Sequence, residues 1–350
     1  MTGWLAGIGT VVSLELRQRV RGVAWYVLLG VFVALVAIVS LVLAASLGSW
    51  TDDAGAAIYS TVVYFVLLLA TLVSPALSGN AINGDRESGT LATTQVTLIS
   101  TPQLVLGKCL AAWVSSLAFL VAAVPFLVFA GFFGGVRAEV VLVSIVVLLV
   151  ELGVVSALGV GLSGLLRRPL FSIVVTYLTV AMLSVGTLIA FGIAGLAIQT
   201  TATQRYESFG GPTFEDWDNT ESCTVQEQEI TLPRFDTAWW VLASNPYVVL
   251  ADAVPTTFDR HGSPTDLFGV VKTGVRSAQL PVGEQDPREY DCDPSTWGSY
   301  PTPEQIVATT VPTWFVGLAI HVGLGVAALA GAVATTRTPS RRLAAGSRVA

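Results

Sequence analysis

Few side chains in this sequence are suited to catalysis, metal binding or proton transfer, and two of them, Glu151 and His321, lie inside long apolar segments. Glu151 lies about 12 residues into one segment, where a carboxylate in a membrane costs roughly 2.5–3.5 kcal/mol and normally contacts protein or water. His321 lies about nine residues into another. At a rise of about 1.5 Å per residue their depths differ by only about 5 Å, so a contact is geometrically allowed. Proton or cation handling, a substrate contact and a structural hydrogen bond remain open for Glu151, and a structural role is favoured for His321.

Other catalytic patterns are missing from the sequence. It holds only two histidines and three cysteines, and no His/Cys cluster has the spacing of a zinc site. The segment closest to a nucleotide-binding loop is Gly107-Lys108-Cys109, but Pro102 stands where the first glycine is required and Cys109 replaces Ser or Thr. We therefore expect no catalytic residue, metal site or cofactor on this chain, and no ATP hydrolysis by the chain alone.

The composition indicates which elements must position these residues. Hydrophobic residues make up 53% of the 350 residues and charged residues 12%, about half the share in soluble proteins. Each of six windows with almost no charge is longer than the roughly 20 residues that cross a bilayer. They are 22–51, 54–84, 109–136, 140–166, 169–204 and 305–336. The predicted fold is an all-α polytopic membrane protein with six transmembrane helices, which excludes a soluble enzyme, a nucleic-acid-binding protein and a secreted module.

Residues 1–22 precede the first span and predict an amphipathic helix at the membrane surface; a frayed tail is the alternative. Apolar residues recur there at helical spacing: Leu5, Ile8, Val12, Leu16 and Val20. The apolar run after them has about 25 residues, whereas the apolar region of a signal peptide has roughly 7–15. A retained first span is therefore favoured over a cleaved signal peptide.

Basic residues predict the orientation. With the N-terminus inside, eleven Lys and Arg fall on inner segments, and only Arg137 falls on a short outer loop. Both termini are therefore expected in the cytoplasm, with residues 199–311 outside. The uncharged segment Thr237–Ala251 is too short to favour a further span, and its tryptophans favour the interface.

Residues 199–311 differ in composition from the spans and predict an extracellular domain. They hold 17 acidic and 6 basic residues and 10 of the 16 prolines. Cys223 and Cys292 predict a disulfide closing a loop of about 70 residues, worth roughly 3–4 kcal/mol; two free cysteines are the alternative. Alternation over 224–230 predicts a strand, and Asn245-Pro246 predicts the start of a short helix that ends near Val254.

A polar loop follows the second span. Residues 80–91 read N-A-I-N-G-D-R-E-S-G-T-L, followed by Ser100-Thr101-Pro102 and Gly107-Lys108. This loop resembles that of permease subunits of type-2 ATP-binding-cassette exporters, in which an E-R-x-x-G-T-L stretch precedes a T-P turn and a G-K pair. The resemblance also covers the N-terminal helix and the six-span layout, with spans four to six matching in pattern alone. The sequence departs from the family in two respects: its acidic–basic pair is shifted into Asp85-Arg86-Glu87, and its external insert is far longer. The longer insert leaves the substrate unassigned.

The resemblance implies a transport subunit that moves substrate out of the cytoplasm or inner leaflet. Arginines outnumber lysines 16 to 2, which favours a bacterial source and hence the plasma membrane of a bacterial cell. The partners of this subunit would be cytoplasmic ATPase subunits that carry ATP and Mg, a second permease subunit (identical or paralogous) and membrane lipid, without nucleic acid. Loop 80–103 would dock the ATPase, with Gly89 permitting a tight turn and Thr90 capping the next helix; an ordinary solvated loop is the alternative. The docking residues would be Asp85, Arg86, Glu87, Gly89 and Thr90.

Two rival functions remain open. A proton-coupled secondary transporter would use Glu151 and His321, although no inverted repeat is visible. A membrane scaffold would use the acidic outer domain to recruit a partner. Small residues recur every four positions around Glu151 and around His321, which predicts close helix packing within the chain.

The predicted division of the chain is an N-terminal helix over 1–22, spans one to five over 23–198, the external domain over 199–311, span six over 312–335 and a cytoplasmic tail over 336–350.

Overall fold

The computed structural model describes residues 2–48, 54–91, 99–209, 223–281 and 301–337. It is mostly helical and contains six helical segments long and apolar enough to cross a membrane, which confirms the predicted multi-pass layout. The first, second and fourth begin and end within about four residues of their charge-poor windows. The third begins eight residues before its window, the fifth ends seven residues before the end of its window, and the sixth begins nine residues after the start of its window. The six are α2 (Val23–Leu47), α3 (Ala54–Ser78, with its polar extension), α6 (Thr101–Gly131), α7 (Ala138–Leu165), α8–η1–α9 (Pro169–Ala197) and α13 (Trp314–Thr336).

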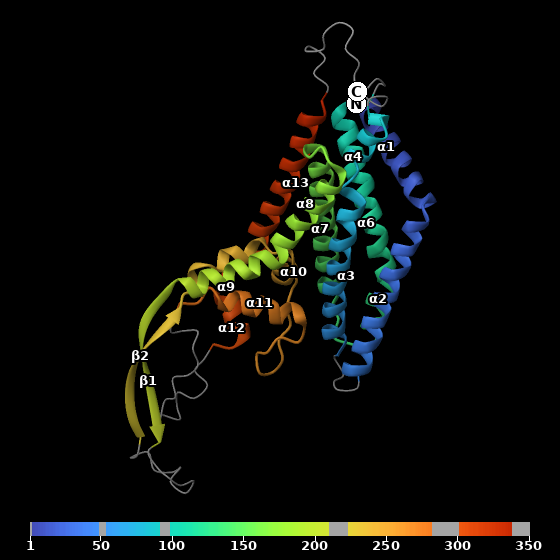
Figure 1. Ribbon diagram of the computed structural model, residues 1–350. Helices are drawn as coiled ribbons and strands as arrows, with labels where there is room; N and C mark the ends of the chain where they lie inside the picture. The colour runs from blue at the N-terminus through green and yellow to red at the C-terminus, as the bar shows by residue number, and fades with distance from the viewer. Residues whose placement is uncertain (1, 49–53, 92–98, 210–222, 282–300, 338–350) are drawn as a thin grey trace.

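The central bundle is formed by α2, α3, α6 and α7, with α13 running along α7 (Figure 1). Its core is aliphatic and aromatic, as shown by Val66, Phe119 and Leu148, which are almost completely buried. Small residues bring α7 and α13 together, since a Cβ placed on Gly161 would lie 2.5 Å from Ala328. The predicted small-residue stripes therefore pack within the chain.

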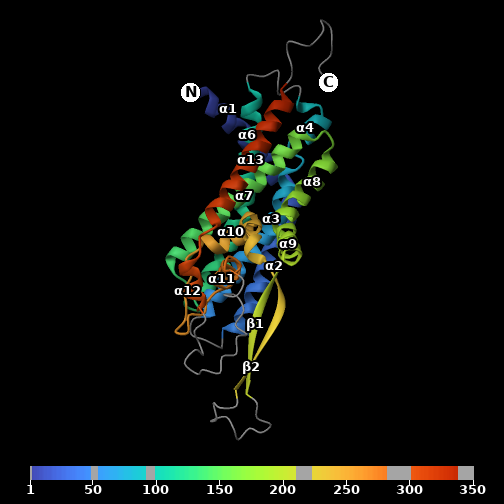
Figure 2. The same cartoon turned by 90° about the vertical axis from the view of Figure 1, so that its left-hand side faces the viewer.

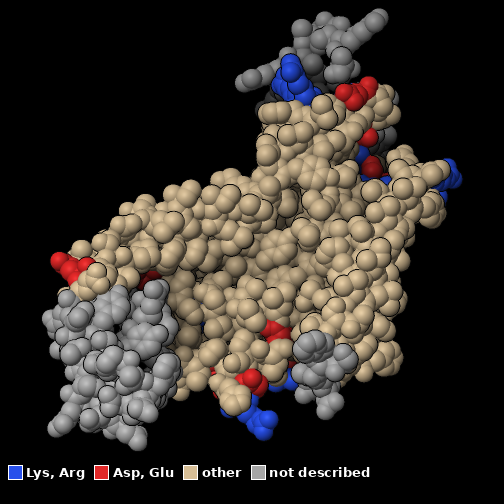
Figure 3. Space-filling view, turned by 60° about the horizontal axis from the view of Figure 1, so that its bottom comes forward, with Lys and Arg blue, Asp and Glu red and all other residues tan. Residues whose placement is uncertain are grey.

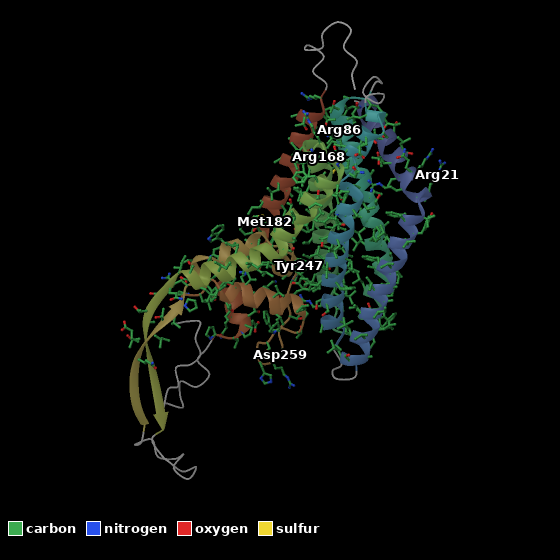
Figure 4. All side chains as sticks on the ribbon, in the orientation of Figure 1. Arg21, Arg86, Arg168, Met182, Tyr247 and Asp259 are labelled. Carbon is green, nitrogen blue, oxygen red and sulfur yellow. The ribbon has the colours of Figure 1, made fainter. Side chains whose placement is uncertain are left out.

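The first residues of α1 and the last residues of α13 lie at one end of the bundle, which we call the terminal end; the opposite end is the distal end (Figures 1 and 2). Charged side chains gather toward these ends, and the face shown in Figure 3 is mostly uncharged between them. Figure 4 shows the same separation, with Arg86 and Arg168 near the terminal end and Asp259 at the distal end.

Helix α1 (Thr2–Arg21) confirms the predicted N-terminal helix and packs against α6. The side that it turns inward differs in part from the predicted stripe. Ile8 and Val11 are buried, whereas Leu5 and Val20 are exposed. This rotation turns Glu15 toward α6, where it finds a basic partner.

The insert between α9 and α13 begins with a two-stranded antiparallel ribbon that projects from the bundle (Figure 2). Strand β1 (Gln199–Phe209) pairs with β2 (Cys223–Pro233), which confirms the predicted strand. The Cys223 side chain and Cys292 lie outside the described residues, so the disulfide stays a prediction. Short helices follow: η3 (Phe235–Thr237), η4 (Trp239–Ser244), α10 (Pro246–Ala253), α11 (Leu267–Ser277) and α12 (Pro303–Thr309).

The segment Thr237–Ala251 forms short helices that break at Asn245. Asn245 caps α10 by accepting hydrogen bonds from the backbone N–H groups of Tyr247, at 2.9 Å, and Val248, at 3.4 Å. These helices pack against α13, and α10 also packs against α7. The last apolar window is likewise divided. Pro312 disfavours helical backbone in the residue before it, so α12 ends at Thr309 and α13 begins only at Trp314.

A buried ion pair fixes the insert to the start of α13; we call it the distal anchor and define it as Asp252, Arg276 and Thr313. One carboxylate oxygen of Asp252 accepts a hydrogen bond from Arg276 Nε at 2.7 Å. The other accepts from the backbone N–H groups of Thr313 at 2.6 Å and Trp314 at 3.0 Å. Asp252 therefore supplies the N-terminal cap that α13 does not obtain from its own side chains.

Candidate functional site

The polar loop after α3 contains the short helix α4 (Asn83–Glu87), which ends in a tight turn at Gly89. Gly89 has φ of 73°, a left-handed conformation that favours glycine, as expected from the sequence. Glu87, Gly89 and Thr90 are exposed at this turn. The hydroxyls of Thr90 and Ser88 lie 2.9 Å apart. Thr90 and Leu91 are themselves helical, and the rest of the helix that Thr90 was expected to cap lies outside the described residues.

Lys108 connects three elements at the terminal end. Its side chain is 2% exposed, and its ammonium group contacts the carboxylates of Glu15 on α1 and, at 2.8 Å, Asp85 on α4. We call these three residues the inner cluster. It contains two acids and one base, so one negative charge is not balanced within it. Asp85 therefore braces α4 against α6.

Gly107 allows the inner cluster to form. A Cβ at this position would lie 2.7 Å from the side chain of Val11, so only glycine lets α1 lie this close to α6. Gln103 fixes the same crossing, because its amide donates a hydrogen bond to the carbonyl of Trp4 at 2.9 Å and its oxygen closes the capping box with Ser100. The close contact between α1 and α6 over two helical turns brings the carboxylate of Glu15 to the ammonium group of Lys108.

Arg86 was predicted as a docking residue, but its side chain is partly buried and turned toward α7. Its guanidinium donates to the carbonyls of Gly164 at 3.0 Å and Leu166 at 3.3 Å, and to Asn83 Oδ1 at 2.7 Å. A helix C-terminus leaves carbonyl groups without helical partners, and a cation satisfies them well. Arg86 thus acts first as the C-terminal cap of α7.

Arg19 plays a similar part for α3. Its Nη2 donates to the carbonyl of Leu77 at 2.9 Å, in the last turn of that helix. Burial lowers the pKa of Arg19, and the nearby negative charge of Glu15 opposes this shift. The terminal ends of α3 and α7 are each held by an arginine, and α6 by the inner cluster.

A cavity of about 640 Å³ lies between α1, the α4 turn and the start of α6. Its lining is mixed, with the carboxylates of Glu15 and Asp85, the ammonium of Lys108 and apolar side chains such as Leu14 and Leu104. Thr90 is part of the wall, so the exposed turn forms one rim of this groove. Glu87, Gly89 and Thr90 are therefore the predicted docking residues that remain exposed for a partner.

A second polar site lies within the bundle, where Glu151 and His321 are in contact. Glu151 is the 14th of the 28 residues of α7, and His321 is the eighth residue of α13. His321 Nδ1 lies 2.9 and 3.1 Å from the two carboxylate oxygens of Glu151, and His321 Nε2 lies 2.8 Å from the carbonyl oxygen of Ser244. Both side chains are at most 2% exposed.

Ser244 ends η4, so this site joins the insert to two spans at the depth of the middle of α7. The next residue continues the connection, because Asn245 Nδ2 donates to the carbonyl of Ser184 at 2.6 Å and to Thr187 Oγ1 at 2.9 Å. Ser184 belongs to the π-helical turn η1 (Met182–Gly186), which interrupts the fifth span. η4 and α10 therefore connect α7, α13 and the fifth span.

Sequence reasoning missed three residues that these sites depend on: Glu15, Ser244 and Asp252. Glu15 is an acid among arginines in the sequence and faces inward in the structure, which indicates a buried basic partner. Asp252 is an acid in an otherwise apolar segment, 62 residues before the first residue of the helix that it caps. Ser244 contributes only its carbonyl group, which no side-chain pattern reveals.

Among the described residues, no group of three or more His, Cys, Asp or Glu side chains is arranged to hold a metal ion. Comparison with family models found no match, and comparison with curated proteins found no significant relative.

Proposed function

We propose that the chain is the permease subunit of a type-2 ATP-binding-cassette exporter, with ATP bound and hydrolysed on a separate chain. The observation that carries this proposal is the exposed turn of α4 beside the groove of α1. It presents Glu87 and Thr90 to solvent, while the residues around it are tied to two spans, α6 and α7, and through Lys108 to α1. A loop that needed only to connect two spans would not require these ties.

The ties give a physical route for coupling. Asp85 connects α4 to α6 and, through Lys108, to α1. Arg86 connects α4 to the end of α7, which packs along α13. A partner that pushed on Glu87 and Thr90 would therefore displace α4 together with α1, α6 and α7. In this proposal ATP binding on the partner supplies that push and switches the pathway between the spans.

The orientation and the assembly belong to the same proposal. The terminal end faces the cytoplasm of a bacterial cell, and the insert faces outward, where Cys223 and Cys292 form a disulfide. A second permease subunit, identical or paralogous, completes the transporter. The exposed apolar faces of α2 and the fifth span, with Val31 and Leu178 among their residues, are available to lipid and to that subunit.

A proton-coupled secondary transporter is the second candidate, and the contact between Glu151 and His321 favours it. Such a protein would transport without ATP and would lose transport in Glu151→Gln. The exporter proposal requires ATP whether or not position 151 can be protonated. The two candidates therefore differ in their energy source.

ATP turnover tests the proposal. The tagged chain would be purified alone in lipid nanodiscs and, separately, isolated from its native membrane with the proteins that remain bound. We expect background turnover for the chain alone and clear turnover for the native complex, on a co-purifying chain with Walker motifs. Turnover by the chain alone, or a native preparation free of any such ATPase, would contradict the proposal.

A further inference from the structure

We propose that Glu151 and His321 form a binding site for one proton, and that this proton decides whether Ser244 stays bound to α13. This inference goes beyond the proposed function and does not depend on it, because it concerns how the insert is held to the spans. It rests on the three contacts of the His321 ring and on the chemistry of imidazole.

The contacts fix the number of protons. The carbonyl of Ser244 can only accept a hydrogen bond, so His321 Nε2 must carry a proton across the 2.8 Å contact. His321 Nδ1 faces both oxygens of Glu151, and a further proton must lie between nitrogen and carboxylate. This proton gives either an imidazolium beside a carboxylate or a neutral imidazole beside a carboxylic acid. In both cases the pair has no net charge.

Loss of the shared proton makes the two contacts incompatible. A neutral imidazole has one N–H group, which can donate to Glu151 or to Ser244 but not to both. A hydrogen bond to a carboxylate is roughly twice as strong as one to a neutral acceptor. The ring therefore keeps its N–H on Nδ1, toward Glu151, and Nε2 turns a lone pair toward the Ser244 carbonyl. The contact with η4 becomes repulsive.

Binding of a second proton is disfavoured by the same geometry. An imidazolium beside a protonated Glu151 would leave a positive charge in a site where both side chains are at most 2% exposed. The site therefore holds one proton when η4 is attached. Release of η4 accompanies the loss of that proton.

The elements packed against the pair bring few competing charges. These elements are α3, α6, α8, α10 and η4, and η4 has no titratable side chain. The titratable groups on the other four, and the one further group on α7, are Tyr59, Tyr64, Lys108, Cys109, Glu139, Tyr177, Tyr247 and Asp252. Lys108 is bound in the inner cluster, Asp252 in the distal anchor and Glu139 by Arg137. Among described residues, the hydrogen-bond partners of the pair are each other and Ser244.

The local backbone is shaped for this contact. One turn before His321, a Cβ on Gly317 would lie 1.9 Å from the carbonyl oxygen of Ala243, so glycine is needed for η4 to reach α13. Asn245, next to Ser244, holds the π-helical turn of the fifth span. Release of Ser244 would therefore loosen the connection between α13 and the fifth span, whereas the distal anchor would keep α10 at the start of α13.

Nitrogen-15 NMR on labelled histidine tests the proton directly. The chain has only two histidines, so His261→Gln leaves the signals of His321 alone. In lipid nanodiscs across about pH 6–10, which spans the ordinary range of histidine and beyond, we expect an Nε2–H signal at low pH that is lost at high pH, where Nδ1–H is the one N–H signal of the ring. An imidazole that keeps its proton on Nε2 after titration, or that titrates identically in Glu151→Gln, would overturn the proposal.

Hydrogen exchange of η4 provides the second measurement. The amides of Val241 and Asn245 are bonded within this segment, and release of Ser244 should lower their protection by about tenfold over the same pH range. In Glu151→Gln the side-chain amide can donate to Nδ1 while Nε2–H still donates to Ser244. Protection in this variant should therefore be independent of pH. A pH-independent wild type, or an equal loss in both proteins, would overturn the proposal whether or not the chain couples to ATP.

Discussion

The inner cluster and the distal anchor are both built from oppositely charged side chains, but they differ in burial and completeness. In the distal anchor, Asp252 and Arg276 are each at most 4% exposed, and a hydrogen bond reaches both carboxylate oxygens. In the inner cluster, Lys108 is buried while Glu15 and Asp85 are 15% and 27% exposed, and the acids outnumber the base. The distal anchor therefore leaves no charged group exposed for a partner, whereas the inner cluster leaves two carboxylates partly exposed.

This difference has a consequence for function. A buried ion pair contributes little net stability but is costly to break, so it fixes one geometry. The inner cluster is only partly buried, so its carboxylates can still be contacted by a partner. The insert is therefore fixed at the start of α13, and α4 is held firmly enough to transmit a displacement yet remains accessible.

The largest expected effect is at the distal anchor. Asp252→Ala removes the cap of α13 and leaves the Arg276 guanidinium buried without its carboxylate, which should cost about 3–5 kcal/mol. Thermal unfolding of the purified protein in nanodiscs would measure the loss. Glu304→Ala, an exposed acid on α12 of the same insert, is the matched control and should stay within about 0.5 kcal/mol. Equal stabilities for the two variants would show that the distal anchor does not stabilise the folded protein.

A smaller effect is expected at the inner cluster. Lys108→Ala leaves the carboxylates of Glu15 and Asp85 close together, but both can be partly hydrated, so the cost should be about 1–3 kcal/mol. Adding Glu15→Gln removes the repulsion and should recover part of that loss in the same unfolding assay. If the double variant is less stable than Lys108→Ala, the two acids do not repel each other and the cluster is wrongly described.

The spans and short insert elements could be predicted because their signals are local. Long apolar runs identify the six spans, and Asn245-Pro246 identifies the start of α10. The two polar sites depend on contacts between distant residues. Lys108 meets Glu15 across 93 positions only because Gly107 lets two helices cross closely. His321 meets Ser244 through a backbone carbonyl. Depth along the spans placed Glu151 and His321 at the same level but could not show which faces they present.

Charge reversal at the exposed turn tests whether a partner docks on α4. Glu87 makes no described contact that a reversal would break, so Glu87→Lys should change stability by no more than about 0.5 kcal/mol. Glu304→Lys makes the same change on an exposed acid at the distal end. Binding of the co-purified ATPase to nanodisc-held protein should fall by tenfold or more in Glu87→Lys, since like charges at an interface cost several kcal/mol. Binding should be unchanged in Glu304→Lys. Equal ATPase binding by the two folded variants would show that the ATPase does not dock on the α4 turn.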